Sequence, residues 1–427
     1  MKNNQPWKKG EETQPRKLLS LPPSFQNFLS NIDWDCVKSV LSAFLITRIM
    51  VVVITYFSLA LIPPSSAMNW FERLIPGNLV LDGLIRWDSI HFLTIAKDGY
   101  ENPSLFLLLP MYPLLIRFTF SLIRNFYLSA LFIPNLSFLI SLFYLYLFTK
   151  EEFDKSTASR AVFYLASAPT AFFFSAAYTE SIALMFIMMC FYYSKKEKWL
   201  IAGLAGALAS ATKIQCVFLS IFILFEAFSR NNIRFVPKPW NLASQLALLK
   251  KNLHEVHRML NGIFASALSL TGIVGFMIFT YFKTGDLFFY FHLNQNHGRA
   301  FSWDWPIKLV QTIFSSHKIT GSFLAGEIDN LWYLFDSFTI FVFLPLVIMV
   351  ILKFRPSLSI FTVLCFLMPL TGLKTYGMQR FVLMLVPCFI LLAIWGKRIW
   401  VDRVIVGIFL PLQAFFLILF SHWYWAG

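Results

Sequence analysis

The chain has 427 residues, of which 57% are hydrophobic, 18% aromatic and only 14% charged. A soluble domain carries roughly a quarter charged residues, whereas many apolar runs here approach the roughly 20 residues that cross a bilayer as a helix. The composition excludes an ordinary soluble fold. Because the Leu, Ile and Phe runs lack the alternation of a β-barrel, we expect an all-α polytopic membrane protein.

The net charge of +14 would suggest nucleic acid as a partner for a soluble protein. In a membrane protein, an excess of Lys and Arg in cytoplasmic loops explains it more simply. The five cysteines form no CxxC pair, which favours buried apolar side chains over a disulfide or metal site. No DxD pair, HExxH or P-loop motif occurs in a supporting context. We therefore expect no metal site, no cofactor and no nucleic-acid partner.

The N-terminal residues 1–37 are polar and basic, and the apolar run after them has no obvious small-residue cleavage site. We interpret them as a cytoplasmic tail that precedes a single transmembrane domain, residues 38–427. The first span is 38–62, and it leads into an outer loop over 63–126 whose first part is acidic.

A second topological anchor is the segment 230–258, which has six basic residues against one acid and should be cytoplasmic. Six apolar stretches separate it from the acidic part of the first outer loop. An odd number of them must cross the membrane, because the chain passes from the outer side to the cytoplasmic side. The stretch 104–123 contains Pro110, Pro113 and Arg117, so we expect a re-entrant or juxtamembrane helix there. The five crossing stretches are then 127–149, 161–177, 179–193, 199–212 and 213–230.

Downstream, span 262–282 leads to a second large outer loop, 283–330. Four further spans follow, at 331–352, 356–373, 378–396 and 402–421. The total is about eleven transmembrane helices.

This topology gathers several polar residues on the outer face, where charges at membrane level are costly and often functional. Each also has a structural interpretation. Asp88 could cap the helix that follows it, Glu180 could favour a helix dipole, and Lys213 could extend its ammonium to the interface. Arg380 could anchor an apolar helix, and Arg299 could be a solvated loop charge.

Five segments in order resemble landmarks of the GPI mannosyltransferase 2 family (the PIG-V type) and its bacterial relatives. They are 86–100 (RWDSIHFLTIAKDGY), 109–115 (LPMYPLL), 169–181 (PTAFFFSAAYTES), 295–303 (QNHGRAFSW) and 377–387 (GMQRFVLMLVP). The chain departs from that pattern at Lys213, where relatives usually carry Arg, and at Gln379 and Phe381, which replace a usual Pro and Tyr.

The resemblance implies a GT-C glycosyltransferase that moves a hexose, most often mannose, from a polyprenyl-phosphate sugar to an acceptor hydroxyl. The acceptor is a glycan, lipid or protein on the non-cytoplasmic side of a bacterial inner membrane or, in a eukaryote, the endoplasmic reticulum. By resemblance, Asp88 is the general base of an inverting reaction, which fits the need for a base at the forming bond. The candidate substrate-binding residues are Arg86, Trp87, His91, Tyr112, Tyr178, Glu180, Lys213, Gln295, Arg299 and Arg380.

Two alternatives belong to other functional classes. A lipid-linked sugar transporter or flippase would also need membrane helices and cations that bind phosphate, but it should show midplane charges or an inverted repeat. A non-catalytic subunit of a glycosylation complex would have no activity by itself.

Overall fold

The computed structural model describes residues 33–62, 74–75, 77–229, 259–298, 302, 304, 307, 310–311, 331–372 and 377–424. Every regular element in these ranges is a helix, which confirms the all-α prediction. The α-helices are α2 (Trp34–Leu61), α3 (Leu79–Gly83), α4 (Asp88–Asp98), α5 (Met111–Ile123), α6 (Phe126–Glu152), α7 (Lys155–Ser167), α8 (Glu180–Lys195), α9 (Trp199–Ser210), α10 (Leu219–Ser229), α12 (Thr271–Thr284), α13 (Phe289–Asn296), α15 (Leu331–Lys353), α16 (Pro356–Leu367), α17 (Met378–Phe381), α18 (Val386–Trp395) and α19 (Ile399–Ser421). The 3₁₀ helices are η2 (Pro103–Leu107), η3 (Ala171–Phe174), η4 (Ile214–Phe218), η5 (Met368–Leu370) and η6 (Val382–Met384).

Among the described residues, five helices are long and apolar enough to cross a membrane. They are Trp34–Leu61, Phe126–Glu152, Met259–Thr284, Leu334–Lys353 and Ile399–Ser421. A sixth is added if Met378–Met384 and Val386–Trp395, which meet at a bend of 75°, count as one span. The molecule is thus a multi-pass membrane protein, but the predicted count of eleven spans is not confirmed. Several predicted spans are shorter apolar helices, including α9 and α16.

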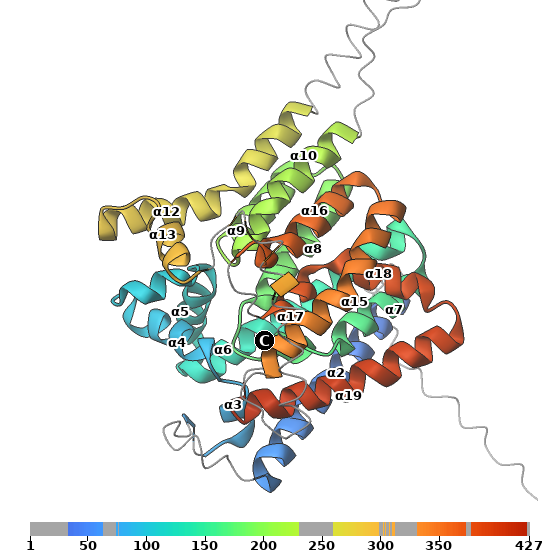
Figure 1. Cartoon of the computed structure of the whole chain (residues 1–427), viewed down its shortest axis with the longest axis horizontal. Helices are drawn as coiled ribbons and strands as arrows, with labels where there is room; N and C mark the ends of the chain where they lie inside the picture. Colours follow the sequence, from blue (N-terminus) through green and yellow to red (C-terminus); the bar gives the residue numbers. More distant parts are fainter. Residues whose placement is uncertain are drawn as a thin grey trace, which may run out of the picture.

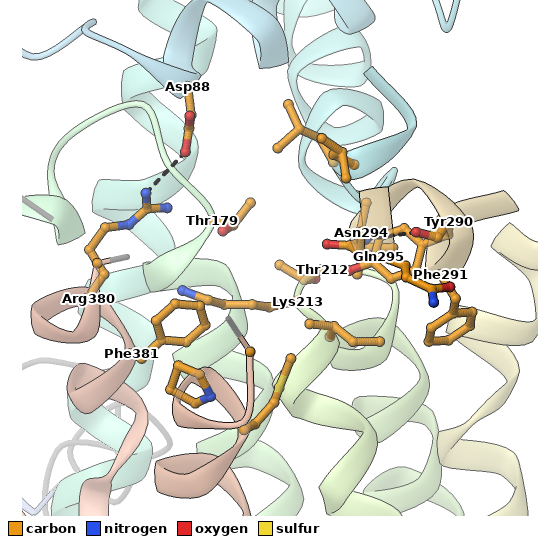
Figure 2. A pocket seen from close by; sticks show the side chains of 18 of the residues that line it. Asp88, Thr179, Thr212, Lys213, Tyr290, Phe291, Asn294, Gln295, Arg380 and Phe381 are labelled. Carbon is orange, nitrogen blue, oxygen red and sulfur yellow. Dashed lines mark hydrogen bonds and ion pairs between the residues drawn. The ribbon is translucent and has the colours of Figure 1, made fainter. Parts of the chain in front are cut away.

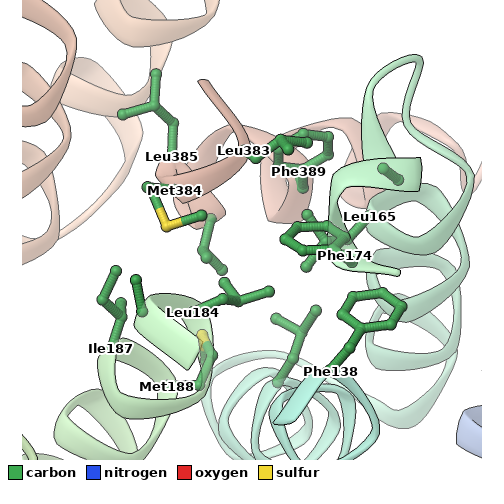
Figure 3. Close-up of a cluster of buried hydrophobic side chains, with 14 of the residues drawn as sticks. Phe138, Leu165, Phe174, Leu184, Ile187, Met188, Leu383, Met384, Leu385 and Phe389 are labelled. Atoms are coloured by element: carbon green, nitrogen blue, oxygen red, sulfur yellow. The ribbon is translucent and has the colours of Figure 1, made fainter. Parts of the chain in front are cut away.

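The core lies where α6, α7, α8 and α18 meet (Figure 1). Figure 3 shows side chains from these helices and from η3 and η6 filling one continuous cluster. Phe138 of α6 stacks on Phe174 of η3 with ring centroids 4.4 Å apart. Offset or stacked aromatic pairs add to the gain from apolar burial, so this cluster fixes the irregular segment between α7 and α8.

The outward faces of α2, α12, α15 and α19 carry exposed Leu, Ile, Val and Phe side chains. An isolated soluble protein rarely exposes so much contiguous apolar surface. Around a multi-pass protein these faces lie against lipid, where apolar side chains are at no disadvantage.

Two glycines bring α12 close to α9. A Cβ on Gly272 would clash with the Ala207 carbonyl oxygen of α9, and one on Gly206 would clash with Ser269, which lies just before α12. Ser210 Oγ also donates a hydrogen bond of 2.8 Å to the Ser269 carbonyl. Small residues permit such close helix packing in membranes, and this contact holds the α12–α13 segment beside the bundle.

The segment 63–126, which we predict to be the first outer loop, contains four short helices, α3, α4, η2 and α5, at one end of the bundle (Figure 1). Helix α5 has 13 residues, fewer than the roughly 20 that a full crossing needs. This length agrees with the predicted re-entrant or juxtamembrane helix in the first outer loop. Three predicted segments lie wholly or mostly outside the described residues: the cytoplasmic loop 230–258, the tail 1–37 and the outer loop 283–330.

Candidate active site

Asp88 is the first residue of α4, and its position is set by the turn before it. Trp87 has a positive φ of 54°, a conformation that residues other than glycine rarely adopt. Tyr178 holds this turn by donating a 3.1 Å hydrogen bond from its hydroxyl to the Arg86 carbonyl oxygen. Helix α4 buries Phe92 and Leu93, whereas the Asp88 side chain keeps 33% of its surface exposed. The carboxylate is therefore rigidly mounted and still accessible.

Glu180 begins α8 and is fully buried. Its Oε1 accepts two charged hydrogen bonds, from Arg380 Nε at 2.9 Å and from Lys213 Nζ at 2.8 Å. Its Oε2 has no hydrogen-bond partner among the described residues. Because an unpaired buried charge is strongly disfavoured, Glu180 and its two cations form a single structural unit.

Arg380 joins this unit to Asp88. Its Nη1 lies 3.0 Å from Asp88 Oδ2, while its Nε contacts Glu180. The guanidinium carbon lies 4.6 Å from the centre of the Tyr178 ring and 5.2 Å from that of Phe173. Cation–π contacts of this kind fix the plane of the guanidinium.

The backbone around Arg380 is also held in place. Gly377 has a positive φ of 76° ahead of the four-residue helix α17, and glycine adopts this conformation at little steric cost. The Met378 backbone N–H donates to Asp336 Oδ1 of α15 at 2.6 Å. Thr170 Oγ1 donates to the Gln379 carbonyl oxygen at 2.8 Å. Two separate segments, α15 and the turn at Thr170, thus fix the short helix that carries Arg380.

Neighbouring charges act on the pKa values of the two buried groups, and neither Glu180 nor Lys213 lies in a helix long and apolar enough to span the membrane. Burial alone raises the pKa of the Glu180 carboxyl, but the charges of Arg380 and Lys213 outweigh it and lower that pKa to about 2. Burial lowers the pKa of the Lys213 ammonium, and the Glu180 carboxylate opposes this shift. A carboxylate between two cations is the arrangement that makes burial of all three tolerable.

A cavity of about 490 Å³ lies in front of these groups. Figure 2 shows Asp88, Arg380 and Lys213 on one side of it and Tyr290, Asn294 and Gln295 of α13 across from them. Its remaining walls are largely apolar, with side chains from 107–109, 368–369 and Ile214. Such a cavity, apolar with a few converging polar groups, is typical of ligand sites. Within the described ranges, no group of three or more His, Cys, Asp or Glu side chains could hold a metal.

Of the residues selected from the sequence, Asp88, Lys213, Gln295 and Arg380 line the cavity. Glu180 lies behind it and reaches it only through the two cations. Arg299 lies outside the described residues.

Three other candidates do not line the cavity. Tyr112 is fully buried and donates to the Ala130 carbonyl oxygen at 2.7 Å. Tyr178 is buried against Arg380. His91 is exposed on the surface of α4.

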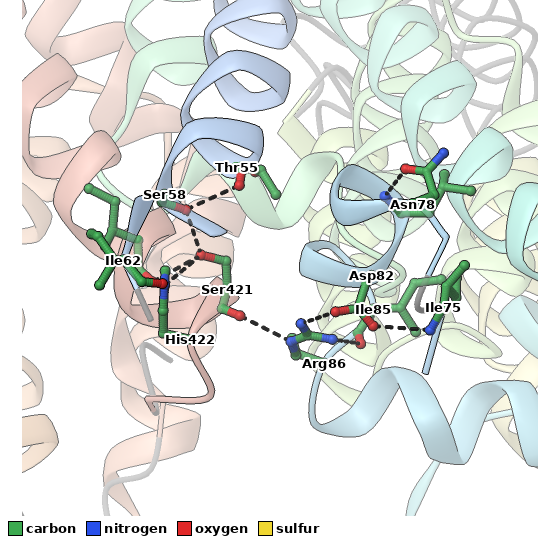
Figure 4. Close-up of polar contacts among 12 residues, drawn as sticks. Thr55, Ser58, Ile62, Ile75, Asn78, Asp82, Ile85, Arg86, Ser421 and His422 are labelled. Atoms are coloured by element: carbon green, nitrogen blue, oxygen red, sulfur yellow. Dashed lines mark hydrogen bonds and ion pairs between the residues drawn. The ribbon is translucent and has the colours of Figure 1, made fainter. Parts of the chain in front are cut away.

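Arg86 and Trp87 also do not line the cavity. Figure 4 shows Arg86 between Asp82 and Ser421. Arg86 is 2% exposed and pairs with Asp82 at 2.5 Å. It donates to the Ser421 carbonyl oxygen at 3.1 Å, and its guanidinium carbon lies 4.6 Å from the Trp423 ring centre. The Trp87 ring contacts the same Trp423 edge-on. Arg86 thus joins the first outer loop to the end of α19.

Several site residues were not selected from the sequence. Thr179, Thr212, Tyr290 and Asn294 line the cavity, but nothing in the sequence distinguishes these common polar residues. Asp336 is different, because it is an acid within the apolar helix α15 and is 1% exposed. An acid inside a span is a recognised signal of function or special structure, and that signal could have identified it.

Comparison with known proteins gives one match to a family of sequences. Residues 103–250 match the family described as dolichyl-phosphate-mannose-protein mannosyltransferase. No curated protein matches the chain. The match covers about a third of the chain, and the long apolar helices support a multi-pass membrane protein. The narrower resemblance to the GPI mannosyltransferase 2 family stays a prediction.

Among solved structures, the chain is similar to the Archaeoglobus fulgidus oligosaccharyltransferase in its apo form, with 13% identity and a TM-score of 0.44 over 91% of this chain and 56% of that one. It is also similar to the archaeal oligosaccharyltransferase AglB from Archaeoglobus fulgidus in complex with an inhibitory peptide and a dolichol-phosphate. That match has 13% identity and a TM-score of 0.40 over 90% of this chain and 55% of that one. The chain thus spans about half the length of the solved structures that it matches.

Proposed function

We propose that the protein is an inverting glycosyltransferase that moves a hexose, mannose in the first instance, from a polyprenyl-phosphate donor to an acceptor hydroxyl. Asp88 is the general base, and Arg380 and Lys213 bind the phosphate of the donor. The observation that carries the proposal is one accessible carboxylate beside two cations at the wall of a cavity of about 490 Å³.

The chemistry requires these groups. The acceptor oxygen forms a bond to the anomeric carbon while the bond from that carbon to the phosphate oxygen breaks. The acceptor proton passes to Asp88, and the negative charge develops on the departing lipid phosphate. A positioned base contributes typically 10²–10⁴-fold to such a step, and fixed cations stabilise the negative charge that develops on the leaving phosphate.

The number of carboxylates at the cavity favours a reaction that inverts the configuration of the anomeric carbon. A retaining mechanism commonly uses a second carboxylate as a nucleophile. Among the described residues that line the cavity, Asp88 is the single carboxylate. Glu180 lies behind Arg380 and Lys213 and is committed to both. A single displacement with Asp88 as base is therefore favoured.

The identity of the donor rests on two kinds of support. The match of residues 103–250 to a family described by dolichyl phosphate and mannose favours a lipid-phosphate mannose donor. The apolar walls of the cavity suit the first isoprene units next to the phosphate. The same topology that makes 63–126 an outer loop puts the reaction on the non-cytoplasmic side, at the bacterial inner membrane or in the lumen of the endoplasmic reticulum.

The proposal is tested by incubating the purified full-length chain in lipid nanodiscs with polyprenyl-phosphate mannose and a panel of glycan, lipid and peptide acceptors. Mass spectrometry should detect an acceptor that is heavier by one hexose, together with free polyprenyl phosphate. Movement of the intact donor across proteoliposomes without covalent transfer would indicate a flippase instead. Activity only when another subunit is added would indicate a non-catalytic component.

A further inference from the structure

Arg380 is shared between two carboxylates whose surroundings differ. Glu180 is fully buried and holds Nε at 2.9 Å. Asp88 holds Nη1 at 3.0 Å, and its side chain is 33% exposed at the cavity. Solvent weakens a partly exposed ion pair, whereas removing one partner of a fully buried pair is strongly unfavourable. The Asp88 contact is therefore the one that a ligand can replace.

The geometry also decides which part of the guanidinium a ligand can reach. The Phe173 and Tyr178 rings lie against the group, and Glu180 occupies Nε. Nη2 makes no hydrogen bond in the part of the chain that the structure describes. The Nη edge is thus the side that can bind two oxygens of a phosphate, and Asp88 now occupies half of it.

We propose that the donor phosphate displaces Asp88 from the Nη edge of Arg380, and that Glu180 is a positioning residue that holds Arg380 during this exchange. The inference rests on the proposed function and adds a control step to it. Asp88 is paired with Arg380 while the cavity is empty and becomes a free base only after the donor has bound.

The charges of the site support the exchange. In the structure, two cations face two carboxylates, Asp88 and Glu180. An incoming phosphate adds negative charge beside Asp88 and takes away its counter-ion. Both changes favour the protonated form of a carboxyl group. Asp88 is then released from its counter-ion at the stage when it must accept the proton of the acceptor hydroxyl.

The test measures binding of undecaprenyl monophosphate to purified full-length protein in nanodiscs, without any transfer reaction. We compare wild type, Asp88→Asn, Arg380→Lys and the double variant. If Asp88 competes for Arg380, Asp88→Asn should tighten binding about threefold or more. A lysine ammonium retained by Glu180 lacks the second edge that reaches Asp88, so the gain should largely disappear in the Arg380→Lys background.

Equal tightening in both backgrounds would mean simple charge repulsion and would overturn the exchange, as would no tightening in Asp88→Asn. Failure of the proposed function is distinguishable. If these binding effects appear but no sugar is transferred, the function fails and the exchange stands. If transfer occurs without them, the exchange alone fails.

The role of Glu180 is tested by Glu180→Gln, with Glu226→Gln as the matched control. Glu226 is also fully buried and is paired with Arg355 at 3.1 Å, but it does not line the cavity. Both variants lose a buried carboxylate, and thermal unfolding reports that shared effect. Only Glu180→Gln should weaken undecaprenyl monophosphate binding, by about tenfold or more. Equal binding by the two variants would remove Glu180 from the proposal.

Discussion

At the scale of single residues, the neighbours of each charged side chain in the site limit the contacts that it can make with a substrate. Lys213 lies at the cavity wall with its ammonium 2.8 Å from Glu180 and 5.0 Å from the centre of the Phe381 ring. These contacts point a single charge at the position that we assign to the donor phosphate. Lys213 should therefore affect donor binding more than the chemical step.

We predict that Lys213→Met raises the KM for polyprenyl-phosphate mannose about tenfold or more, because a charge-assisted hydrogen bond to phosphate is lost. Lys213→Arg keeps the charge and should retain most of the affinity. Steady-state kinetics of the two variants check this. A fall in kcat at unchanged KM would instead assign Lys213 to the chemical step.

Asp88, Glu180, Lys213 and Arg380 could be selected from the sequence because charges near apolar runs are rare and expensive. The different roles of these four residues could not be predicted. Nothing in the sequence indicates that Glu180 lies behind Arg380 rather than in the cavity, because that depends on how α8 and α17 meet. The role of Arg86 could not be predicted from the sequence either. Asp88, two residues away, lines the cavity, whereas Arg86 is buried against Asp82.

At the scale of helices, hydropathy located the apolar segments, but it did not predict where their helices break, and the predicted number of spans is not confirmed. The segment 378–396 reads as one span in the sequence, yet its helices bend by 75° beside Arg380. The stretches near 199–230 form the short helices α9, η4 and α10, with Lys213 between α9 and η4. Each of these breaks in the helices places a charged side chain at the cavity, Arg380 in the first case and Lys213 in the second. Irregular backbone at membrane depth is tolerated where it lines such a space.

Arg86 illustrates an interaction between helices that is structural. Its pairing with Asp82 and with the Ser421 carbonyl ties the α3–α4 turn to the end of α19. We predict that Arg86→Met leaves Asp82 unpaired and lowers the free energy of unfolding by about 3–5 kcal/mol, while donor KM in the folded protein stays unchanged.

Thermal unfolding measures this effect, and Arg117→Met, at an exposed position of α5, is the matched control. If Arg86→Met left stability unchanged but raised the KM, Arg86 would act in substrate binding, as its place in the sequence motif first indicated.

At the scale of the whole molecule, a second charged cluster lies at a distance from the candidate site. Arg355 pairs with both Glu152 and Glu226, and Lys195 also pairs with Glu152. These residues lie at the ends of helices that the charge bias assigns to the cytoplasmic side. The two clusters thus mark opposite ends of the bundle, one of them beside the cavity.

This orientation predicts the result of labelling single cysteines with a membrane-impermeant maleimide in intact cells. Glu101→Cys in the first outer loop should react from outside, and Trp240→Cys, which lies outside the described residues, should not. The five native cysteines are buried and should add little background. The reverse pattern of labelling would place the cavity on the cytoplasmic side.

The central claim is that Asp88 is the base of a glycosyl transfer, and the most direct measurement compares transfer from polyprenyl-phosphate mannose by wild type, Asp88→Asn and Asp98→Asn. Asp98 is the matched control, because it is an exposed carboxylate at the other end of the same helix. We predict that Asp88→Asn lowers kcat about 10²–10⁴-fold while the protein remains folded and binds donor, and that Asp98→Asn has nearly the wild-type rate. Full activity in a folded Asp88→Asn variant would contradict the account.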